Sequence, residues 1–177
     1  MPGAGTQTAA LTLGGEKEPG YVDSEACFEY DGSTWTATGA FIKVSSKAGI
    51  AGSTSAAIAF GGSAGPTPSA DAATYNGSTW TETNNFNTPR GSMGHSSGPQ
   101  TAVLICGGDD WPAPGYNKNT ESWNGTSWTE VNDLNIGKRL MGSGGIQTSM
   151  IVFGGQVSGD ADTTQTEQWD GTSWTEV

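Results

Sequence analysis

The chain has 177 residues, of which 18 are acidic and 7 are basic, so its formal net charge is −11 at pH 7. This charge argues against a nucleic-acid partner, because phosphate binding requires clustered Lys and Arg. No apolar run approaches the ~18 residues that a membrane span requires. Glycine accounts for 28 residues and tryptophan for seven. The composition therefore indicates one acidic all-β domain covering residues 1–177.

Four copies of a six-residue motif run through the chain. The motif is Tyr/Trp-Asp/Asn-Gly-Ser/Thr-Ser/Thr-Trp, and its last Trp recurs after 45, 48 and 46 residues. A glycine pair at the end of an apolar run precedes each copy. The repeated residues, which we expect to be structural, are Gly14, Gly15, Tyr30, Trp35, Gly61, Gly62, Tyr75, Trp80, Gly107, Gly108, Trp123, Trp128, Gly154, Gly155, Trp169 and Trp174. Such spacing predicts four consecutive repeat units.

Each unit predicts four short strands in the same order. The first consists of very small residues, as at 48–54 and 141–146, and the second is a continuous apolar run at 9–13, 56–60, 102–106 and 149–153. A strand that is apolar on both faces is covered on both faces. The third alternates, as at 26–30 and 120–123. Asp-Gly or Asn-Gly then predicts a type I′ hairpin turn before a β-branched and aromatic fourth strand.

Four antiparallel strands whose faces are covered by neighbouring units describe a blade of a β-propeller. No segment has a helical pattern. We therefore predict an all-β β-propeller fold with four four-stranded antiparallel blades in this chain. Their approximate boundaries are 1–38, 39–84, 85–131 and 132–177.

The markers as a set resemble the kelch repeat, in a divergent Gly/Thr-rich form similar to repeats in proteins of bacteria and their phages. Arg90 followed by His95 fits the start of a kelch first strand in one unit, whereas Arg139 retains only the Arg. The hexamer also looks like the Asp-box of sialidase-like propellers. It lacks the residue between Asp and Gly, so we interpret it as a convergent turn. The resemblance implies a β-propeller built from these repeats.

The number of repeats raises the question of closure. Kelch propellers imply about six or seven blades, so four blades of that kind leave an open arc with exposed apolar faces. The predicted strands run from a first strand to a fourth, so we expect no strand to be left over that could close a ring by exchange between the ends. Two solutions remain: a homodimer that forms an eight-bladed ring, or a tight four-bladed ring. We favour self-association.

Enzymatic readings find little support. Sialidase chemistry in the resembling family implies three Arg, and the chain has Arg90 and Arg139 alone. Copper oxidation of the galactose-oxidase kind implies two His, and His95 is the single histidine. We expect His95 to have a packing role and expect no catalytic residue, cofactor or metal. The two cysteines are expected to be buried free thiols, because each lies in an apolar or mixed strand segment.

The loops that follow the glycine pairs vary between units and are expected to share one face with the connections between blades. Variable loops on a rigid scaffold are where binding usually resides. The candidate ligand-binding residues are Trp111, Tyr116, Tyr21, Asp109, Asp110, Arg90 and Arg139. An aromatic ring beside carboxylates suits a sugar, whose apolar face stacks on the ring. Solvated loop charge, without a ligand, is the alternative interpretation of the same residues.

We therefore expect a non-catalytic propeller that acts as a structural or binding module for a protein or glycan partner on a virion or cell surface. The N-terminus has no basic segment followed by an apolar one, so no signal peptide is expected. The alternative is a lectin with repeated sugar pockets between blades, in which the hexamer aromatics contact the sugar.

Overall fold

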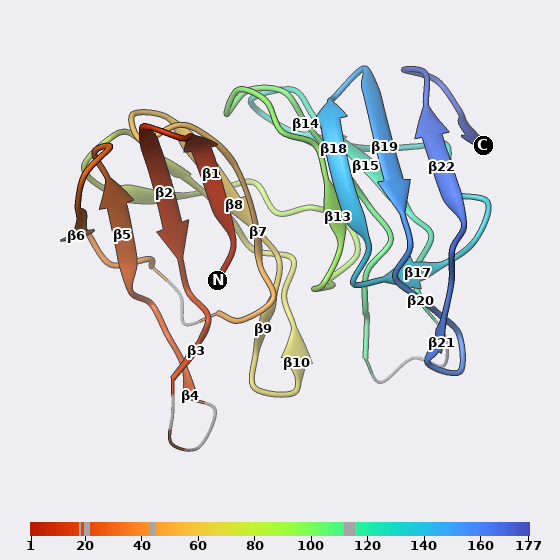
Figure 1. The fold of residues 1–177 in the computed structure, drawn as a ribbon, viewed down its shortest axis with the longest axis horizontal. Coiled ribbons are helices and arrows are strands. Elements are labelled where there is room, and N and C mark those ends of the chain that lie inside the picture. Colours follow the sequence, from red (N-terminus) through yellow and green to blue (C-terminus); the bar gives the residue numbers. More distant parts are fainter. Residues whose placement is uncertain (18, 20–21, 43–44, 112–115) are drawn as a thin grey trace.

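The protein is built from strands alone. The computed structural model describes residues 1–17, 19, 22–42, 45–111 and 116–177 (Figure 1). These residues form four four-stranded antiparallel sheets and three smaller ribbons, and they include no helix. It follows that no described helix is long and apolar enough to span a membrane.

In each large sheet the four strands pair in chain order. The first sheet contains β1 (Gly3–Thr6), β2 (Ala9–Leu13), β5 (Cys27–Tyr30) and β6 (Trp35–Thr38). The second contains β7 (Gly49–Gly52), β8 (Ala57–Phe60), β11 (Ala72–Tyr75) and β12 (Trp80–Thr83). The third contains β13 (Gly94–His95), β14 (Val103–Cys106), β15 (Thr120–Trp123) and β16 (Trp128–Val131). The fourth contains β18 (Gly142–Ile146), β19 (Ser149–Phe153), β22 (Thr166–Trp169) and β23 (Trp174–Glu176). The four predicted four-stranded units are thus confirmed as sheets.

Short ribbons extend from one end of the sheets. They are β3 (Glu16–Lys17) with β4 (Val22–Asp23), β9 (Ser63–Ala64) with β10 (Thr67–Pro68), and β20 (Gln156–Val157) between β17 (Lys138–Arg139) and β21 (Ala161–Asp162). All lie at the lower end of the molecule in Figure 1. We call this end, together with residues 109–111, the ribbon face. The expectation that these segments share one face is confirmed.

The hexamer forms a four-residue loop, so the predicted type I′ turn is wrong. Tyr30 pairs with Trp35 across the hairpin, and of the loop residues between them only Gly32 has a positive φ. The Asp31 carboxylate accepts hydrogen bonds from the backbone N–H groups of Ser33 and Thr34, each at 2.8 Å. These bonds lower the pKa of Asp31 to about 2. The side chain therefore closes a loop that a positive φ at Asp31 would otherwise have to make.

The glycine pairs are required by the backbone path. Both residues of every pair have a positive φ, for example 62° at Gly107 and 107° at Gly108. A Cβ on Gly108 would lie 2.7 Å from the carbonyl oxygen of Gly91. The chain thus leaves the second strand in a conformation and at a contact distance that only glycine accepts readily.

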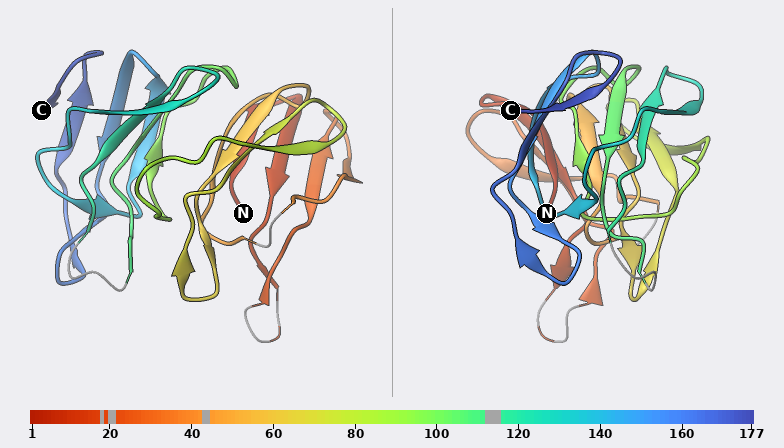
Figure 2. Two further views of the ribbon diagram at one scale, coloured as in Figure 1. Left: turned by 180° about the vertical axis from the view of Figure 1, so that it is seen from behind. Right: turned by 90° about the vertical axis from the view of Figure 1, so that its right-hand side faces the viewer.

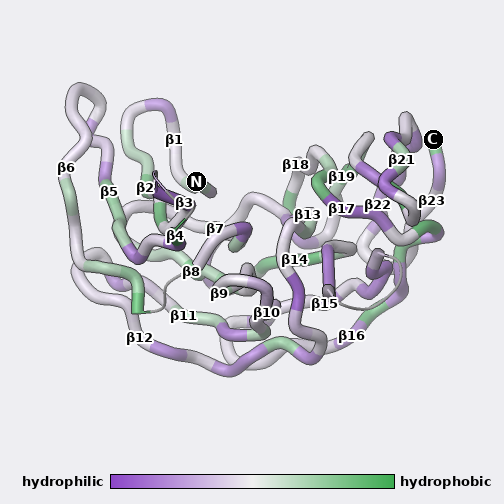
Figure 3. Tube along the Cα trace, turned by 90° about the horizontal axis from the view of Figure 1, so that it is seen from below, coloured by the Kyte–Doolittle hydropathy of each residue, from purple (hydrophilic) through white to green (hydrophobic). Residues whose placement is uncertain are grey.

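The four sheets follow one another along an arc, seen from below in Figure 3. Figure 2 shows the C-terminus at the outer edge of the fourth sheet, whereas the N-terminus lies beside the first sheet, toward the middle of the molecule. Three hydrophobic clusters fill the spaces between the first and second, second and third, and third and fourth sheets. Cys27 and Cys106 are buried free thiols within them, as predicted.

Buried ion pairs anchor the connections that enter the third and fourth sheets. Arg90 Nη1 lies 2.7 Å from Glu121 Oε1, and both side chains are fully buried. Lys138 Nζ lies 3.1 Å from Glu167 Oε1 in the corresponding place. Each carboxylate also accepts a backbone N–H of an asparagine, which is Asn87 in the third sheet and Asn135 in the fourth. The loop before each of these two sheets is therefore fixed to the sheet that follows it.

Candidate functional site

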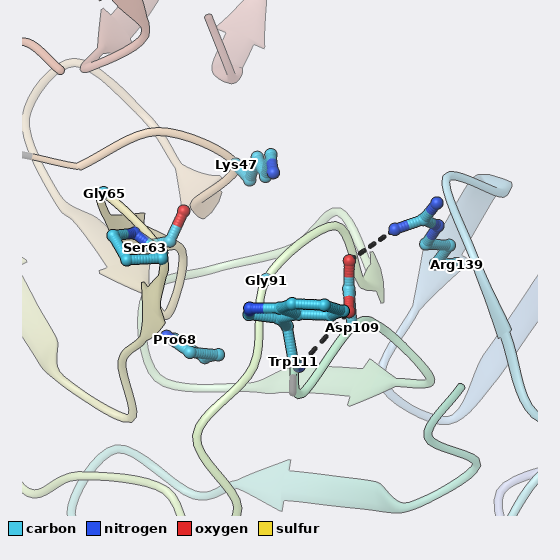
Figure 4. A pocket seen from close by; sticks show the side chains of 9 residues that line it. Lys47, Ser63, Gly65, Pro68, Gly91, Asp109, Trp111 and Arg139 are labelled. Atoms are coloured by element: carbon cyan, nitrogen blue, oxygen red, sulfur yellow. Dashed lines mark hydrogen bonds and ion pairs between the residues drawn. The ribbon is translucent and has the colours of Figure 1, made fainter. Parts of the chain in front are cut away.

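A pocket of about 290 Å³ opens on the ribbon face, between the second sheet and the third and fourth sheets. Figure 4 shows the Trp111 ring between Pro68 on one side and Asp109 on the other, with Lys47 above. Trp111 is 60 % exposed, so most of its indole surface is available to a ligand. The lining residues are Lys47, Ser63, Gly65, Pro66, Pro68, Gly91, Asp109, Trp111 and Arg139.

Arg139 organises the charged side of the pocket. Its Nη1 lies 2.6 Å from Asp109 Oδ2 and its Nη2 lies 2.9 Å from Asp160 Oδ1. Its guanidinium carbon lies 4.5 Å from the centre of the Tyr116 ring, which it covers. The fork of the guanidinium suits two carboxylates at once. One cation therefore holds residues from two separate ribbon-face segments in a fixed arrangement.

The Tyr116 hydroxyl completes this group by donating to the Asp160 carboxylate. That hydrogen bond raises the pKa of Tyr116, because a carboxylate acceptor stabilises the protonated phenol. The phenol therefore stays neutral at physiological pH and continues to hold Asp160 in place.

Backbone pairing positions the tryptophan. Gly91 N donates to Asp109 O at 3.0 Å and Asp109 N donates to Gly91 O at 2.8 Å, which forms an isolated bridge. The Asp109 carboxylate accepts the Trp111 N–H at 3.3 Å. Asp109 thus fixes the start of the loop that carries Trp111 and pairs with Arg139 at the same time.

Lys47 supplies an exposed cation at the pocket. It has a φ of 58°, a conformation that is uncommon for a residue with a side chain. Its carbonyl oxygen accepts the Ser92 N–H at 3.0 Å, which ties the two strand entrances together. Within the described part of the chain its ammonium group forms no ion pair. Lys47 is therefore a charge that a ligand can reach.

The structure brings together some of the predicted ligand-binding residues and separates others. Trp111, Asp109 and Arg139 line the pocket, and Tyr116 contacts Arg139. Asp110 accepts a hydrogen bond from Asn117 at 3.3 Å and does not line the pocket. Arg90 is fully buried against Glu121 and is unavailable to a ligand. Tyr21 lies outside the described residues.

Lys47 and Asp160 belong to the site but were not selected from the sequence. The sequence did contain a pattern that indicates the burial of Arg90. An Asn lies three residues before Arg90 and also before Lys138, and a Glu occurs two residues before the first hexamer aromatic in the same two units. This pattern marks the two buried pairs. Arg139 is the residue after Lys138, so it does not occupy the position of the buried cation.

His95 lies at the inner side of the arc, apart from the ribbon-face pocket. It borders a hollow of about 700 Å³ that is also lined by Met1, Ser92 and Leu140. Its ring contacts Phe60 edge-on at 5.6 Å, and burial lowers its pKa. No group of three or more His, Cys, Asp or Glu that could hold a metal ion occurs among the described residues. These contacts are those of a packing residue.

No protein-family model matches the chain, and no curated protein matches it significantly.

Proposed function

We propose that the four sheets are consecutive blades of a kelch-like β-propeller. The support is the repeated four-stranded meander, the arc of sheets and the three hydrophobic clusters between successive sheets. Propeller blades pack face to face around a central axis with their first strands innermost. The β1, β7, β13 and β18 strands contact one another in sequence, as this arrangement requires.

We infer that the propeller is a non-catalytic module, structural or binding, whose partner docks on the ribbon face at Trp111. A virion or a cell surface is the setting that we propose for it. The observation that carries the proposal is a 60 % exposed indole at the mouth of a pocket whose charged wall is already assembled around Arg139. Such a wall loses little conformational entropy when a ligand binds.

A glycan suits this pocket best among the partners considered. The indole face stacks on the apolar face of a sugar ring, while Asp109 accepts hydroxyl protons and Lys47 donates to sugar oxygens. The volume of about 290 Å³ lies at the lower end of the range for small-ligand pockets. One or two sugar units, or one side chain of a protein partner, match that size.

The alternative lectin, with one sugar pocket between each pair of blades, depends on the hexamer aromatics. Tyr75, Trp123 and Trp169 are at most 2 % exposed, and Trp80 and Trp128 are 7 % and 8 % exposed. They face neighbouring sheets within the hydrophobic clusters. This burial favours the single ribbon-face site over repeated pockets.

The test is binding of the whole chain to an array of neutral and acidic oligosaccharides, followed by calorimetric titration with the best of them. We expect about one sugar site per chain and loss of binding in Trp111→Ala. Val22→Ala is the matched control, because Val22 is also 60 % exposed and lies on the ribbon face, outside the pocket. Several sites per chain, or unchanged binding in Trp111→Ala, would overturn the proposal.

A further inference from the structure

Each junction between neighbouring sheets uses the same set of positions. The second strand of one sheet contributes the residue before the glycine pair and the residue two positions earlier. The next sheet contributes the two aromatics of its hexamer. These sets are Leu11 and Leu13 with Tyr75 and Trp80, Ile58 and Phe60 with Trp123 and Trp128, and Leu104 and Cys106 with Trp169 and Trp174.

A glutamine reinforces two of these junctions. Gln100, in the first hairpin of the third sheet, donates to the carbonyl oxygens of Ala57 at 2.6 Å and Tyr75 at 2.9 Å in the second sheet. Gln147, in the first hairpin of the fourth sheet, donates to the corresponding carbonyls of Val103 at 3.3 Å and Trp123 at 2.5 Å. The amide thus bridges from the later sheet to the earlier one.

The two ends of the arc present the two unpaired halves of this junction. On the fourth sheet, Ile151 and Phe153 occupy the second-strand positions and are 39 % and 50 % exposed. On the first sheet, Trp35 is the second hexamer aromatic and is 52 % exposed. Gln7 precedes Thr8 in the first hairpin, as Gln147 precedes Thr148 in the fourth, and Gln7 is exposed.

A comparison of two phenylalanines shows what the end face lacks. The Phe60 ring lies over Gly49, and the Phe153 ring lies over Gly142 in the same way. Phe60 is fully buried because the third sheet covers it, whereas Phe153 is half exposed. Among the described residues, no hydrophobic cluster joins the fourth sheet to the first. The face around Phe153 is therefore built for a following sheet.

We propose that a second copy of this chain occupies both ends. The fourth sheet of each copy packs on the first sheet of the other. The three junctions within each chain and the two junctions between the chains then make eight junctions in a two-fold ring of eight sheets. Each half that an end needs is present on the opposite end of an identical chain, and the first and fourth sheets stand at opposite ends of the arc (Figure 3). Such a head-to-tail pair closes and leaves neither face exposed.

The internal junctions also specify the polar contact. Gln7 of one copy donates to the carbonyl oxygens of Met150 and Trp169 in the second copy. These carbonyls correspond to those that Gln100 and Gln147 contact, because Met150 and Trp169 pair in the fourth sheet as Ala57 and Tyr75 do in the second. These hydrogen bonds between the Gln7 amide and the two carbonyl oxygens give a fixed orientation to a contact that is otherwise apolar.

The first test is the mass of the 177-residue chain by light scattering over a concentration series. We expect a stable mass of twice 18.1 kDa. A monomer at every concentration would overturn the proposal, and so would a mass that keeps rising with concentration, because that would indicate an open filament.

Variants then test which faces meet. Trp35→Arg and Phe153→Arg should each give folded monomers, since both side chains are about half exposed in the single chain, and their urea midpoints should no longer depend on protein concentration. Thr36→Arg, on the neighbouring exposed position of β6, should still pair. A mixture of the two monomeric variants should form one-junction pairs, because each retains the face that the other lacks. A mixture that stays monomeric, or a dimer of either variant alone, would refute face pairing between first and fourth sheets.

The amide contact has its own measure. Gln7→Ala removes two neutral hydrogen bonds per junction, and we expect a rise in the dissociation constant of about tenfold per junction. An unchanged dissociation constant would show that the junction between copies differs from the internal ones. Sugar binding at Trp111 lies within one chain, so its presence or absence leaves this outcome unaffected.

Discussion

The Arg90–Glu121 pair offers the sharpest test of how the third sheet is held. Glu121→Gln keeps the shape of the side chain and removes its charge. In the structure Oε1 accepts Arg90 Nη1 at 2.7 Å, and Oε2 accepts Asn87 N at 2.7 Å and Asn87 Nδ2 at 2.8 Å. In either orientation of the new amide, its NH₂ group faces one of these donors. The change also leaves the buried Arg90 charge without its counter-ion.

The expected effect is large because two unfavourable terms add. Removing one partner of a fully buried ion pair destabilises a protein by about 3–5 kcal/mol. Arg90 has little compensation, since its Nε and Nη2 have no hydrogen-bond partner among the described residues. The remaining donor contact of Nη1, to Thr88 O at 2.9 Å, does not neutralise the charge. We therefore expect Glu121→Gln to lower the free energy of unfolding by about 4 kcal/mol.

The measurement is equilibrium unfolding in urea, followed by circular dichroism and tryptophan fluorescence. Glu130→Gln is the matched control, because Glu130 pairs with Glu121 across β15 and β16 but is exposed. The control should stay within about 0.5 kcal/mol of the parent. A loss below about 1 kcal/mol in Glu121→Gln would refute this account of the buried pair. Arg90→Met combined with Glu121→Leu should recover part of the loss, since no charge then remains buried.

Three further expectations follow from local geometry. Gly155→Ala should lower the free energy of unfolding by roughly 2–3 kcal/mol, because φ is 88° and a Cβ would lie 2.4 Å from a backbone carbonyl oxygen. Gly159→Ala is the comparison, because Gly159 has open space around it. This second variant should lower the free energy of unfolding by about 1 kcal/mol in the same urea experiment. The folded-state pKa of Asp31 is lowered to about 2, so its contribution to stability is present above the unfolded value of 3.8 and is lost as pH falls toward 2. Asp31→Asn should therefore flatten the acid limb of a plot of urea midpoint against pH, and an unchanged limb would contradict this. Cys27 and Cys106 should resist iodoacetamide in the native chain at pH 8 and react in urea, because burial raises the pKa of both thiols, that of Cys106 to about 12; rapid native alkylation, followed by mass spectrometry, would show that they are accessible.

The four sheets could be predicted from the sequence, because the repeated motifs mark where the strands of each sheet end and turn. The glycine pair before each hexamer marks the end of the second strand, and the hexamer marks the hairpin between the third and fourth. The turn type was missed because Asp-Gly was taken as the whole loop, whereas the Asp31 side chain closes a longer one. The two-residue strands of the ribbon face have no period that could reveal them.

The candidate site was less predictable than the fold. Trp111 stands out because it lies in a variable loop outside the repeated motifs, and the structure places it at one pocket with Arg139. Arg90 was selected together with Arg139, yet it lies one residue earlier in its strand entrance, at the position that corresponds to Lys138, and it is buried against Glu121. Lys47 lies at the pocket with a positive φ, and a lysine at that position gives no sequence signal for such a backbone conformation.

The two buried ion pairs given by the described residues hold the third and fourth sheets, and heating should show a consequence of this placement. The second sheet has Ser45 and Ala73 where the third has Arg90 and Glu121, so these two positions of the second sheet form no buried ion pair. The desolvation penalty of ion pairs falls as temperature rises, while hydrophobic stabilisation per unit area levels off. On heating, the N-terminal half of the arc should therefore become less stable relative to the C-terminal half. Thermal unfolding should start in the first and second sheets and spread toward the third and fourth.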